Sequence, residues 1–246
     1  MTLDFEHFLI TRFNVKNADW KVDKSGVTVR DDLWTYKRLQ LFESVCLPSI
    51  QHQSVKGFKW LIYLDCDTND EVRKRMLHIQ LTNSFIHTKY INGMSGFVET
   101  VREDIRRLLQ AHTSYLITTR IDNDDAFHEC AIANIQSAFE RQKLEVINLL
   151  EGIQWDLNNN NFYYAFNESN PFITLIERLE DNTHIKSVFY KEHRHYAEKP
   201  DKDLKMRQFC GEPMWLQVIH DSNISNKIEG QPILKEGVLD LFNVKS

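Results

Sequence analysis

Short apolar runs alternate with helical patterns over the first 150 residues, and this alternation constrains the fold more than any other feature of the sequence. Five runs predict strands, at residues 6–13, 58–64, 84–90, 114–121 and 144–150. Four segments with apolar side chains at helical spacing predict helices, at residues 32–50, 70–81, 96–111 and 126–142. Such alternation predicts an α/β fold with a mostly parallel sheet flanked by helices on both faces.

Polar residues follow three of the predicted strands at the points where those strands end. Thr11 and Arg12 end the first strand, Asp65 ends the second, and residues 122–125 follow the fourth. Ligands of parallel α/β sheets bind outside the carboxyl ends of the strands. We therefore expect the functional site at this edge of the sheet.

Three carboxylates lie within four residues after the apolar run 115–119, in the order Asp122, Asn123, Asp124 and Asp125. Carboxylates this close repel one another, and holding them near a core is costly unless a cation or hydrogen-bond donors compensate. An Asp-x-Asp pair offers two hard oxygen ligands that suit Mg²⁺ or Mn²⁺ carrying a diphosphate. The alternative is a solvated turn that caps a helix beginning near Ala126.

The alternation stops near residue 150, and the remainder of the chain has a mixed pattern. Four asparagines at residues 158–161 lie between two aromatic-containing runs and predict a β-hairpin. We expect a polar, basic loop around His193 and His195, a loop at 196–201 and a short helix at 212–219. No repeat or domain boundary is evident, so the sequence predicts a single domain over residues 1–246.

The composition, with 42% hydrophobic and 26% charged residues, is that of a soluble globular protein. The net charge of −5 argues against a general nucleic-acid-binding protein, which would carry a basic face. Four widely spaced cysteines favour reduced thiols over a disulfide framework or a zinc site. No apolar run is long enough to span a membrane, and Asp4 and Glu6 do not fit a signal peptide. We therefore expect a cytoplasmic protein. Peripheral contact with the inner face of a membrane is compatible with this expectation.

Five blocks of sequence occur in an order that resembles a known family. They are residues 7–14, 41–53, 60–65, 118–126 and 215–223, and together they span about residues 7–226. The Asp-x-Asp block at 122–125 and the block Trp215-Leu216-Gln217-Val218-Ile219-His220 are the specific parts. The chain resembles GT-A-type glycosyltransferases, and more narrowly a bacterial rhamnosyltransferase family. This resemblance implies a GT-A-like, Rossmann-like sheet, with a nucleotide-sugar-binding half (1–150) and a mixed acceptor-side half (151–246).

The resemblance implies metal-dependent transfer of a sugar from a nucleotide diphosphate donor to an acceptor hydroxyl, in the synthesis of a surface polysaccharide such as lipopolysaccharide or capsule. The donor would be dTDP-, UDP- or GDP-linked, and the acceptor would be a saccharide or a lipid-linked saccharide. The implied cofactor is a divalent cation, Mn²⁺ or Mg²⁺, which stabilises charge on the leaving nucleoside diphosphate. Its ligands would be Asp122, Asp124 and His220.

Nucleotide-sugar contacts are implied for six residues at or near the strand ends: Thr11, Arg12, Asp65, Arg120, Asp122 and Asn123. An inverting transferase also needs a general base for the acceptor hydroxyl. Glu212 is the best positional match, since Pro213 at a first helical position would put Glu212 at a helix start. Glu212 would otherwise only complement the helix dipole. Asp125 is the second catalytic candidate, with Asp156 as a further competitor.

Two other functions fit parts of the sequence. The run Asp65-Cys66-Asp67-Thr68 also fits the first motif of haloacid-dehalogenase-type phosphatases, with Asp65 as the nucleophile and Asp67 as the acid/base. Such enzymes need a separate Ser/Thr strand end, and Thr118 and Thr119 lie too close to the Asp cluster to supply it. The chain could also be a non-catalytic sugar-binding module on a transferase fold, because fold does not fix function.

Substitution of Asp65 distinguishes the two enzymatic alternatives. Asp65→Asn removes the nucleophile of a phosphatase and should abolish phosphate-ester hydrolysis completely. In a transferase the same change only weakens donor binding, so activity persists at high donor concentration. Parallel assays of phosphate-ester hydrolysis and nucleotide-sugar consumption with both proteins decide between them.

Overall fold

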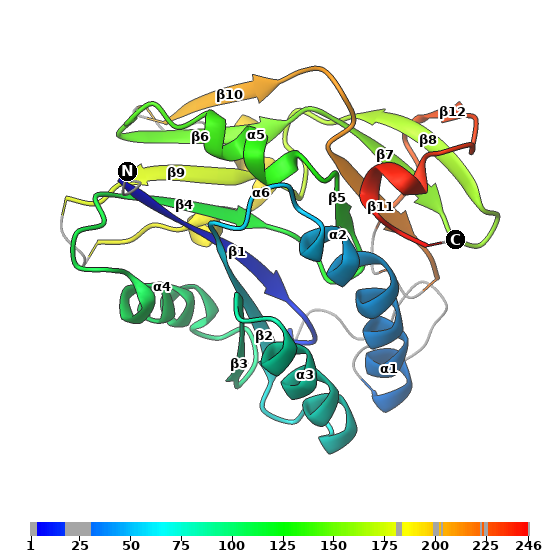
Figure 1. Ribbon diagram of the computed structural model, residues 1–246, viewed down its shortest axis with the longest axis horizontal. Coiled ribbons are helices and arrows are strands. Elements are labelled where there is room, and N and C mark those ends of the chain that lie inside the picture. The colour runs from blue at the N-terminus through cyan, green and yellow to red at the C-terminus, as the bar shows by residue number, and fades with distance from the viewer. Residues whose placement is uncertain are drawn as a thin grey trace.

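The computed structural model describes residues 4–17, 31–180, 184–198, 202, 204–221, 223 and 226–245. Within these residues the chain forms a larger sheet of seven strands and a smaller sheet of five, with helices around them (Figure 1). No helix in the described part of the chain is long and apolar enough to cross a membrane. The division of the chain into a nucleotide-sugar-binding half and an acceptor-side half stays a prediction.

The larger sheet is mostly parallel, as predicted. Its strand order is β10-β6-β9-β4-β1-β2-β3. β3, β2, β1 and β4 are parallel neighbours, β10 is parallel to β6, and β9 is antiparallel to both β4 and β6. The strands are β1 (Phe5–Arg12), β2 (Lys59–Asp65), β3 (Ile86–Ile91), β4 (Tyr115–Arg120), β6 (Leu144–Leu149), β9 (Thr174–Arg178) and β10 (Lys205–Phe209).

The helix predicted over residues 32–50 forms as one continuous unit with a change of winding in its middle. α1 (Asp32–Leu41) continues through a π-helical turn at Phe42–Cys46 into α2 (Leu47–Gln51). Asp31 starts it by accepting a hydrogen bond from the Trp34 N–H at 2.7 Å. The next two predicted helices are α3 (Asp70–Thr82) and α4 (Phe97–Leu108).

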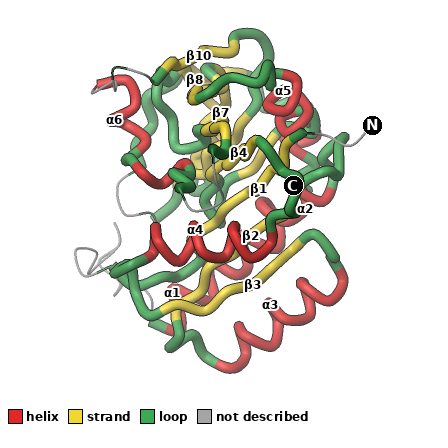
Figure 2. Tube along the Cα trace, turned by 90° about the vertical axis from the view of Figure 1, so that its left-hand side faces the viewer, coloured by secondary structure: helices red, strands yellow, loops and turns green. Residues whose placement is uncertain are grey.

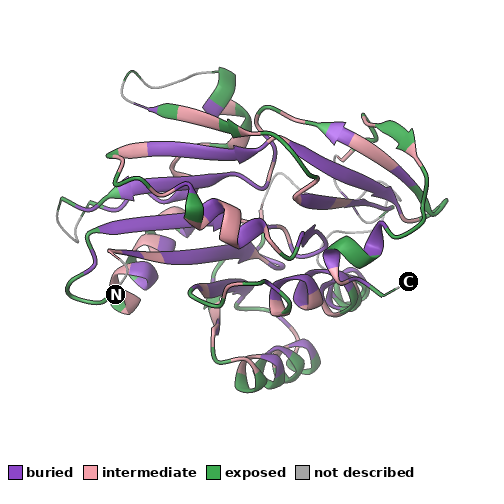
Figure 3. Cartoon of the chain, turned by 45° about the horizontal axis from the view of Figure 1, so that its top comes forward, coloured by how far each residue is buried: buried purple, intermediate pink, exposed green. Residues whose placement is uncertain are grey.

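Two apolar layers cover the two faces of the larger sheet. Successive residues of β1 point to opposite faces, so Leu9 lies in one layer and Phe8 and Ile10 lie in the other. The first layer receives side chains from α1, α2, α3 and α5 (Ala131–Ser137), and the second from α4. Figure 2 shows α3 and α4 on opposite sides of β2 and β3. Figure 3 shows that the central strands are buried along most of their length.

The smaller sheet has the order β12-β8-β7-β11-β5 and contains the predicted hairpin. β7 and β8 are antiparallel and are joined across the Asn-rich turn, while β11 is parallel to β7. β1 and β4 point toward the side of the molecule where this sheet and α1 lie (Figure 1). Its strands are β5 (Ala126–Phe127), β7 (Glu151–Asp156), β8 (Asn161–Phe166), β11 (Trp215–Ile219) and β12 (Gln231–Ile233).

Three local predictions are wrong. The helix predicted over 126–142 is replaced by β5 and the shorter α5, because Ala126 and Phe127 pair antiparallel with β11. The helix predicted over 212–219 is replaced by β11, whose short apolar run fits either structure until its partner strand is known. The loop predicted around His193 is α6 (His193–Glu198), which also takes in the start of the loop predicted at 196–201. Residues 199–201 lie outside the described part of the chain.

Gly152 makes room for the Trp215 ring beside the β7 backbone. It pairs with Trp215, and a Cβ atom on Gly152 would come within 1.9 Å of the Trp215 ring. Trp215 cannot move aside easily, because its ring stacks on Phe172 at 5.1 Å and its Nε1–H donates to the Leu149 carbonyl at 2.7 Å. The glycine therefore leaves the space that the Trp215 ring occupies at the start of β11, the strand that leads into His220.

Gly152→Ala should lower the free energy of unfolding by about 1–3 kcal/mol, because the added methyl group overpacks a closed core. Urea denaturation measures the loss. Gly57→Ala is the matched control, since a Cβ atom there meets nothing within 4 Å. Equal effects of the two substitutions would contradict the packing argument.

Candidate functional site

The carboxyl ends of β1, β2 and β4 meet at one edge of the larger sheet, as the sequence predicts. β4 ends at Arg120, and the loop after it carries Asp122, Asn123, Asp124 and Asp125. The four side chains have different surroundings. Those surroundings decide what the cluster can bind.

Asp124 joins the end of β4 to two distant segments. Its Oδ2 atom lies 3.0 Å from His220 Nε2 and accepts a hydrogen bond from Asn223 Nδ2 at 2.9 Å. The same oxygen forms an ion pair with Arg38 of α1. Burial alone would raise the pKa of Asp124, but Arg38 and His220 hold it well below its ordinary value. Asp124 is therefore a buried, ionised carboxylate.

Asp122 contacts two other arginines, Arg120 and Arg12. It accepts from Arg120 Nη2 at 3.0 Å, and Arg12 Nη2 lies 3.8 Å from it. Its side chain is 31% exposed, so it is the open carboxylate of the cluster. Burial raises its pKa, but the two arginines overcome this and lower it. Asp122 thus stays charged at the exposed side of the cluster.

His193 completes the group around Arg120. Its Nδ1 atom lies 3.2 Å from Arg120 Nη1. Burial and the nearby Arg120 lower the pKa of His193 to about 4, so the ring is neutral at pH 7. With Nδ1 accepting from the guanidinium, the proton is on Nε2, which makes His193 a donor rather than a base. The sequence did not predict this role, because His193 resembled part of a polar loop.

Asp125 is buried, and its Oδ1 atom accepts a hydrogen bond from the Val218 N–H of β11 at 2.9 Å. Burial and the neighbouring Asp124 and Asp122 raise its pKa well above the ordinary value. The hydrogen bond to Val218 anchors the loop to β11, and the raised pKa favours the protonated form of the carboxyl. It is poorly placed to act as the predicted catalytic group.

Asn123 and Thr11 are also turned inward, contrary to their predicted place in an open nucleotide pocket. Asn123 Nδ2 donates to the Phe13 carbonyl at 2.8 Å, which ties the ends of β1 and β4 together. Thr11 is fully buried, and its hydroxyl accepts from Trp60 Nε1 at 2.9 Å. Both side chains therefore support the site from within.

The Asp65 carboxylate is hydrogen-bonded to the backbone of the surrounding loops. It accepts from the N–H groups of Lys16 at 2.9 Å, Gly93 at 3.2 Å and Asp67 at 3.1 Å. These bonds join the loops that follow β1, β2 and β3. A carboxylate with 2% exposure and three such donors is a poor nucleophile, which argues against the phosphatase alternative.

The prediction that Glu212 lies at the start of a helix is wrong. No helix starts at Pro213; Glu212 is exposed in the bend before β11. His220 lies just past the other end of this strand, which spans about 16 Å at 3.3 Å per residue. Glu212 is thus well separated along the strand from the Asp124–His220 contact.

Arg38 is the main residue of the site that the sequence analysis missed. It lies on the buried side of α1 together with Trp34, four residues before it, and Leu39. An arginine within the apolar stripe of a helix is a signal that could have indicated a buried ion pair. Its partner could not be predicted, because Asp124 is distant in the sequence.

The predicted metal ligands are only partly assembled. The described residues contain no group of three or more His, Cys, Asp or Glu side chains that could hold a metal ion. Asp124 and His220 do face each other, and carboxylate oxygen and imidazole nitrogen both bind Mn²⁺. Ions of this class are often held by one or two protein ligands plus water and substrate phosphates. The Asp124–His220 pair fits such an ion, and the ligand roles of Asp122, Asp124 and His220 stay predictions.

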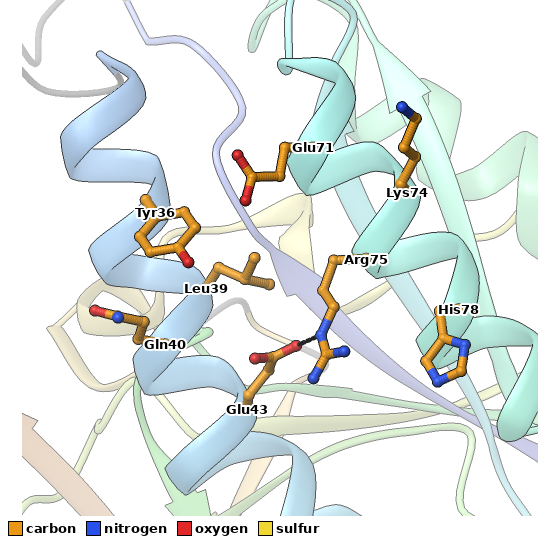
Figure 4. Close-up of a pocket in the computed structure, with 8 residues that line it drawn as sticks. All are labelled: Tyr36, Leu39, Gln40, Glu43, Glu71, Lys74, Arg75 and His78. Carbon is orange, nitrogen blue, oxygen red and sulfur yellow. Dashed lines mark hydrogen bonds and ion pairs between the residues drawn. The ribbon is translucent and has the colours of Figure 1, made fainter.

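A separate groove of about 510 Å³ lies between α1 and α3 (Figure 4). An ion pair between Glu43 and Arg75 crosses it. None of the predicted site residues lines it. The lining residues are Tyr36, Leu39, Gln40, Glu43, Glu71, Lys74, Arg75 and His78.

A family model described as "Putative rhamnosyl transferase" matches residues 6–232 of this chain, which confirms the resemblance seen in the sequence. No curated protein matches this chain. A crystal structure of S. aureus TarS 1-349 with UDP-GlcNAc is similar at 10% identity and a TM-score of 0.50, covering 87% of this chain. TarS 1-349 without a named ligand gives 10% identity, 87% coverage and a TM-score of 0.48. This chain spans 59–60% of the length of these two TarS chains.

A homolog of Mycobacterium tuberculosis rv0371c from mycobacterium sp. strain JC1 gives 8% identity and a TM-score of 0.44, with 85% of this chain and 88% of that chain covered. At these identities the structural likeness concerns the fold alone. The TarS likeness at a TM-score of 0.50 agrees with the mostly parallel sheet and flanking helices described above.

Two substitutions of Asp125 test its role as an uncharged anchor. Asp125→Asn keeps an oxygen that accepts from Val218 N–H, so the free energy of unfolding at pH 7 should stay equal to that of wild type or rise. Asp125→Ala leaves that donor unpaired and should lose about 1–3 kcal/mol. Chemical denaturation measures both, and an equal loss in the two variants would show that the charge of Asp125 matters.

Proposed function

Because this chain belongs to the family described as "Putative rhamnosyl transferase", we propose that it transfers a sugar from a nucleotide diphosphate donor to an acceptor hydroxyl. The observation that carries this proposal is the contact of Asp124 with His220 and Asn223 at the carboxyl ends of the parallel strands. Parallel α/β sheets bind their ligands at this edge. Two arginines, Arg12 and Arg120, lie at the same edge and suit a diphosphate.

Arg12 and Arg120 supply the positive charge that a diphosphate requires. Both contact the single carboxylate of Asp122, and both lie over the Phe189 ring, at 5.6 and 5.9 Å from its centre. Two guanidinium groups and one carboxylate leave a surplus positive charge, which attracts an anionic ligand. During transfer these donors stabilise the negative charge that develops on the leaving nucleoside diphosphate.

We place a divalent cation, Mn²⁺ or Mg²⁺, on Asp124 and His220, with Asp122 as the third predicted ligand. Such an ion, when bound, acts as a Lewis acid on the diphosphate oxygens. Asp125 keeps His220 within reach of Asp124, because it fixes β11 two residues before His220. Asn223 donates a hydrogen bond to the same Asp124 oxygen, and its Nδ2 atom lies 3.1 Å from His220 Nε2.

The donor we propose is dTDP-, UDP- or GDP-linked, and the acceptor is a saccharide or a lipid-linked saccharide of a surface polysaccharide. S. aureus TarS has been crystallised with UDP-GlcNAc, which makes UDP-linked sugars a sensible first choice for assay. We place the reaction in the cytoplasm. The free state of Cys46, Cys66, Cys130 and Cys210 supports a reducing compartment.

Release of nucleoside diphosphate from UDP-, dTDP- and GDP-sugars, with Mn²⁺ or with EDTA, tests the proposal on the purified protein. One donor class should be consumed with Mn²⁺ and not with EDTA. Asp124→Asn should reduce the rate by at least about a hundredfold, since it weakens the cation site that stabilises the leaving group.

Asp240→Asn, an exposed carboxylate in the 3₁₀ turn Leu239–Phe242, is the matched control and should keep the wild-type rate. Binding of a nucleotide sugar without consumption of any of these donors would support the binding-module alternative. Turnover that is unaffected by Asp124→Asn would place the reaction elsewhere on the molecule.

A further inference from the structure

Arg38 is a buried cation at the centre of the candidate site. Its side chain is 8% exposed, and it reaches from α1 to form an ion pair with Asp124, which is 5% exposed. The guanidinium lies over the Trp34 ring, 4.9 Å from its centre. Burying this charge is costly, and the carboxylate of Asp124 offsets the cost. Neither the sequence motifs nor the proposed transfer chemistry assigns Arg38 a role.

Arg38 and the proposed cation compete for the same oxygen atom. The Arg38 guanidinium, His220 Nε2 and Asn223 Nδ2 all meet Oδ2 of Asp124. A divalent ion held by Asp124 and His220 would lie beside this oxygen and would repel the guanidinium at close range. The cation and the guanidinium therefore compete for the negative charge of Asp124.

A displaced Arg38 has an acceptor nearby. Its Nη1 atom already lies 3.4 Å from Asn123 Oδ1, and Asn123 is held in place by its hydrogen bond to the Phe13 carbonyl. A diphosphate arriving with the cation would bring further anionic oxygens to this edge. The planar, forked guanidinium suits such oxygens in pairs, as it suits a carboxylate.

We propose that Arg38 is the counter-ion of Asp124 in the metal-free protein and is displaced from Asp124 when a divalent cation binds together with the nucleotide diphosphate. This inference rests on the proposed function, because it uses the cation assigned to Asp124 and His220. Arg38 therefore weakens cation binding when no diphosphate is present. The site favours the arrival of cation and donor together over the arrival of cation alone.

Calorimetric titration of Mn²⁺ alone into the full chain tests this competition. Arg38→Gln removes the positive charge and keeps a side chain that can donate a hydrogen bond to Asp124. We expect it to bind Mn²⁺ at least about tenfold more tightly than wild type, because a repelling unit charge at contact distance is gone. Arg38→Lys keeps the positive charge, so its Mn²⁺ affinity should be closer to that of wild type than the affinity of Arg38→Gln. Arg75→Gln, which removes an exposed arginine paired with Glu43, should leave Mn²⁺ affinity unchanged.

Equal affinity of wild type and Arg38→Gln for Mn²⁺, or no Mn²⁺ binding by either, overturns the proposal. Circular dichroism shows whether each variant is folded. If Arg38→Gln is unfolded, Arg38→Met takes its place in the same comparison of Mn²⁺ affinity. Failure of the proposed function has a different signature, which is the absence of nucleoside diphosphate release from every donor. If wild type releases nucleoside diphosphate while Arg38→Gln gains no Mn²⁺ affinity, the role of Arg38 alone is refuted.

Discussion

The arrangement of the whole site depends on how the protein accommodates three carboxylates at the end of β4. Asp122 stays partly exposed between Arg12 and Arg120, and remains charged. Asp124 is buried, and remains charged because Arg38, His220 and Asn223 surround one of its oxygens. Asp125 is also buried; burial and the two neighbouring carboxylates raise its pKa, which favours its protonated form, and it accepts from Val218 N–H. Three different solutions relieve a repulsion that would otherwise expel the loop from the core.

These solutions also join parts of the chain that are far apart in sequence. Asp125 binds the backbone of β11 at Val218, and Asp124 binds His220, the residue that directly follows β11. The β7 glycine beside Trp215 leaves space for the Trp215 ring at the start of β11. β11 and the residues that follow it therefore supply some of the polar contacts of the site. The loop after β4 and the helix α1 supply others.

The sequence predicts the parallel half of the fold well, because long apolar runs and capped helices are local signals. For the same reason, it predicts that the polar residues after β1, β2 and β4 gather at one edge of the sheet. It fails at Ala126, which looks like a helix start but pairs with β11, and at Trp215, which begins a run too short to separate strand from helix. It also could not pair Arg38 with Asp124, because no local pattern encodes a contact between a helix and a strand end so far apart.

The most direct test of the account is a crystal structure with Mn²⁺ and the nucleoside diphosphate of the accepted donor, with anomalous scattering measured at the manganese edge. The account predicts an anomalous peak between Asp124 and His220, the diphosphate beside Arg12 and Arg120, and Arg38 no longer on Asp124. A manganese peak elsewhere, or a diphosphate bound away from the end of β4 with the Arg38–Asp124 ion pair intact, would contradict it.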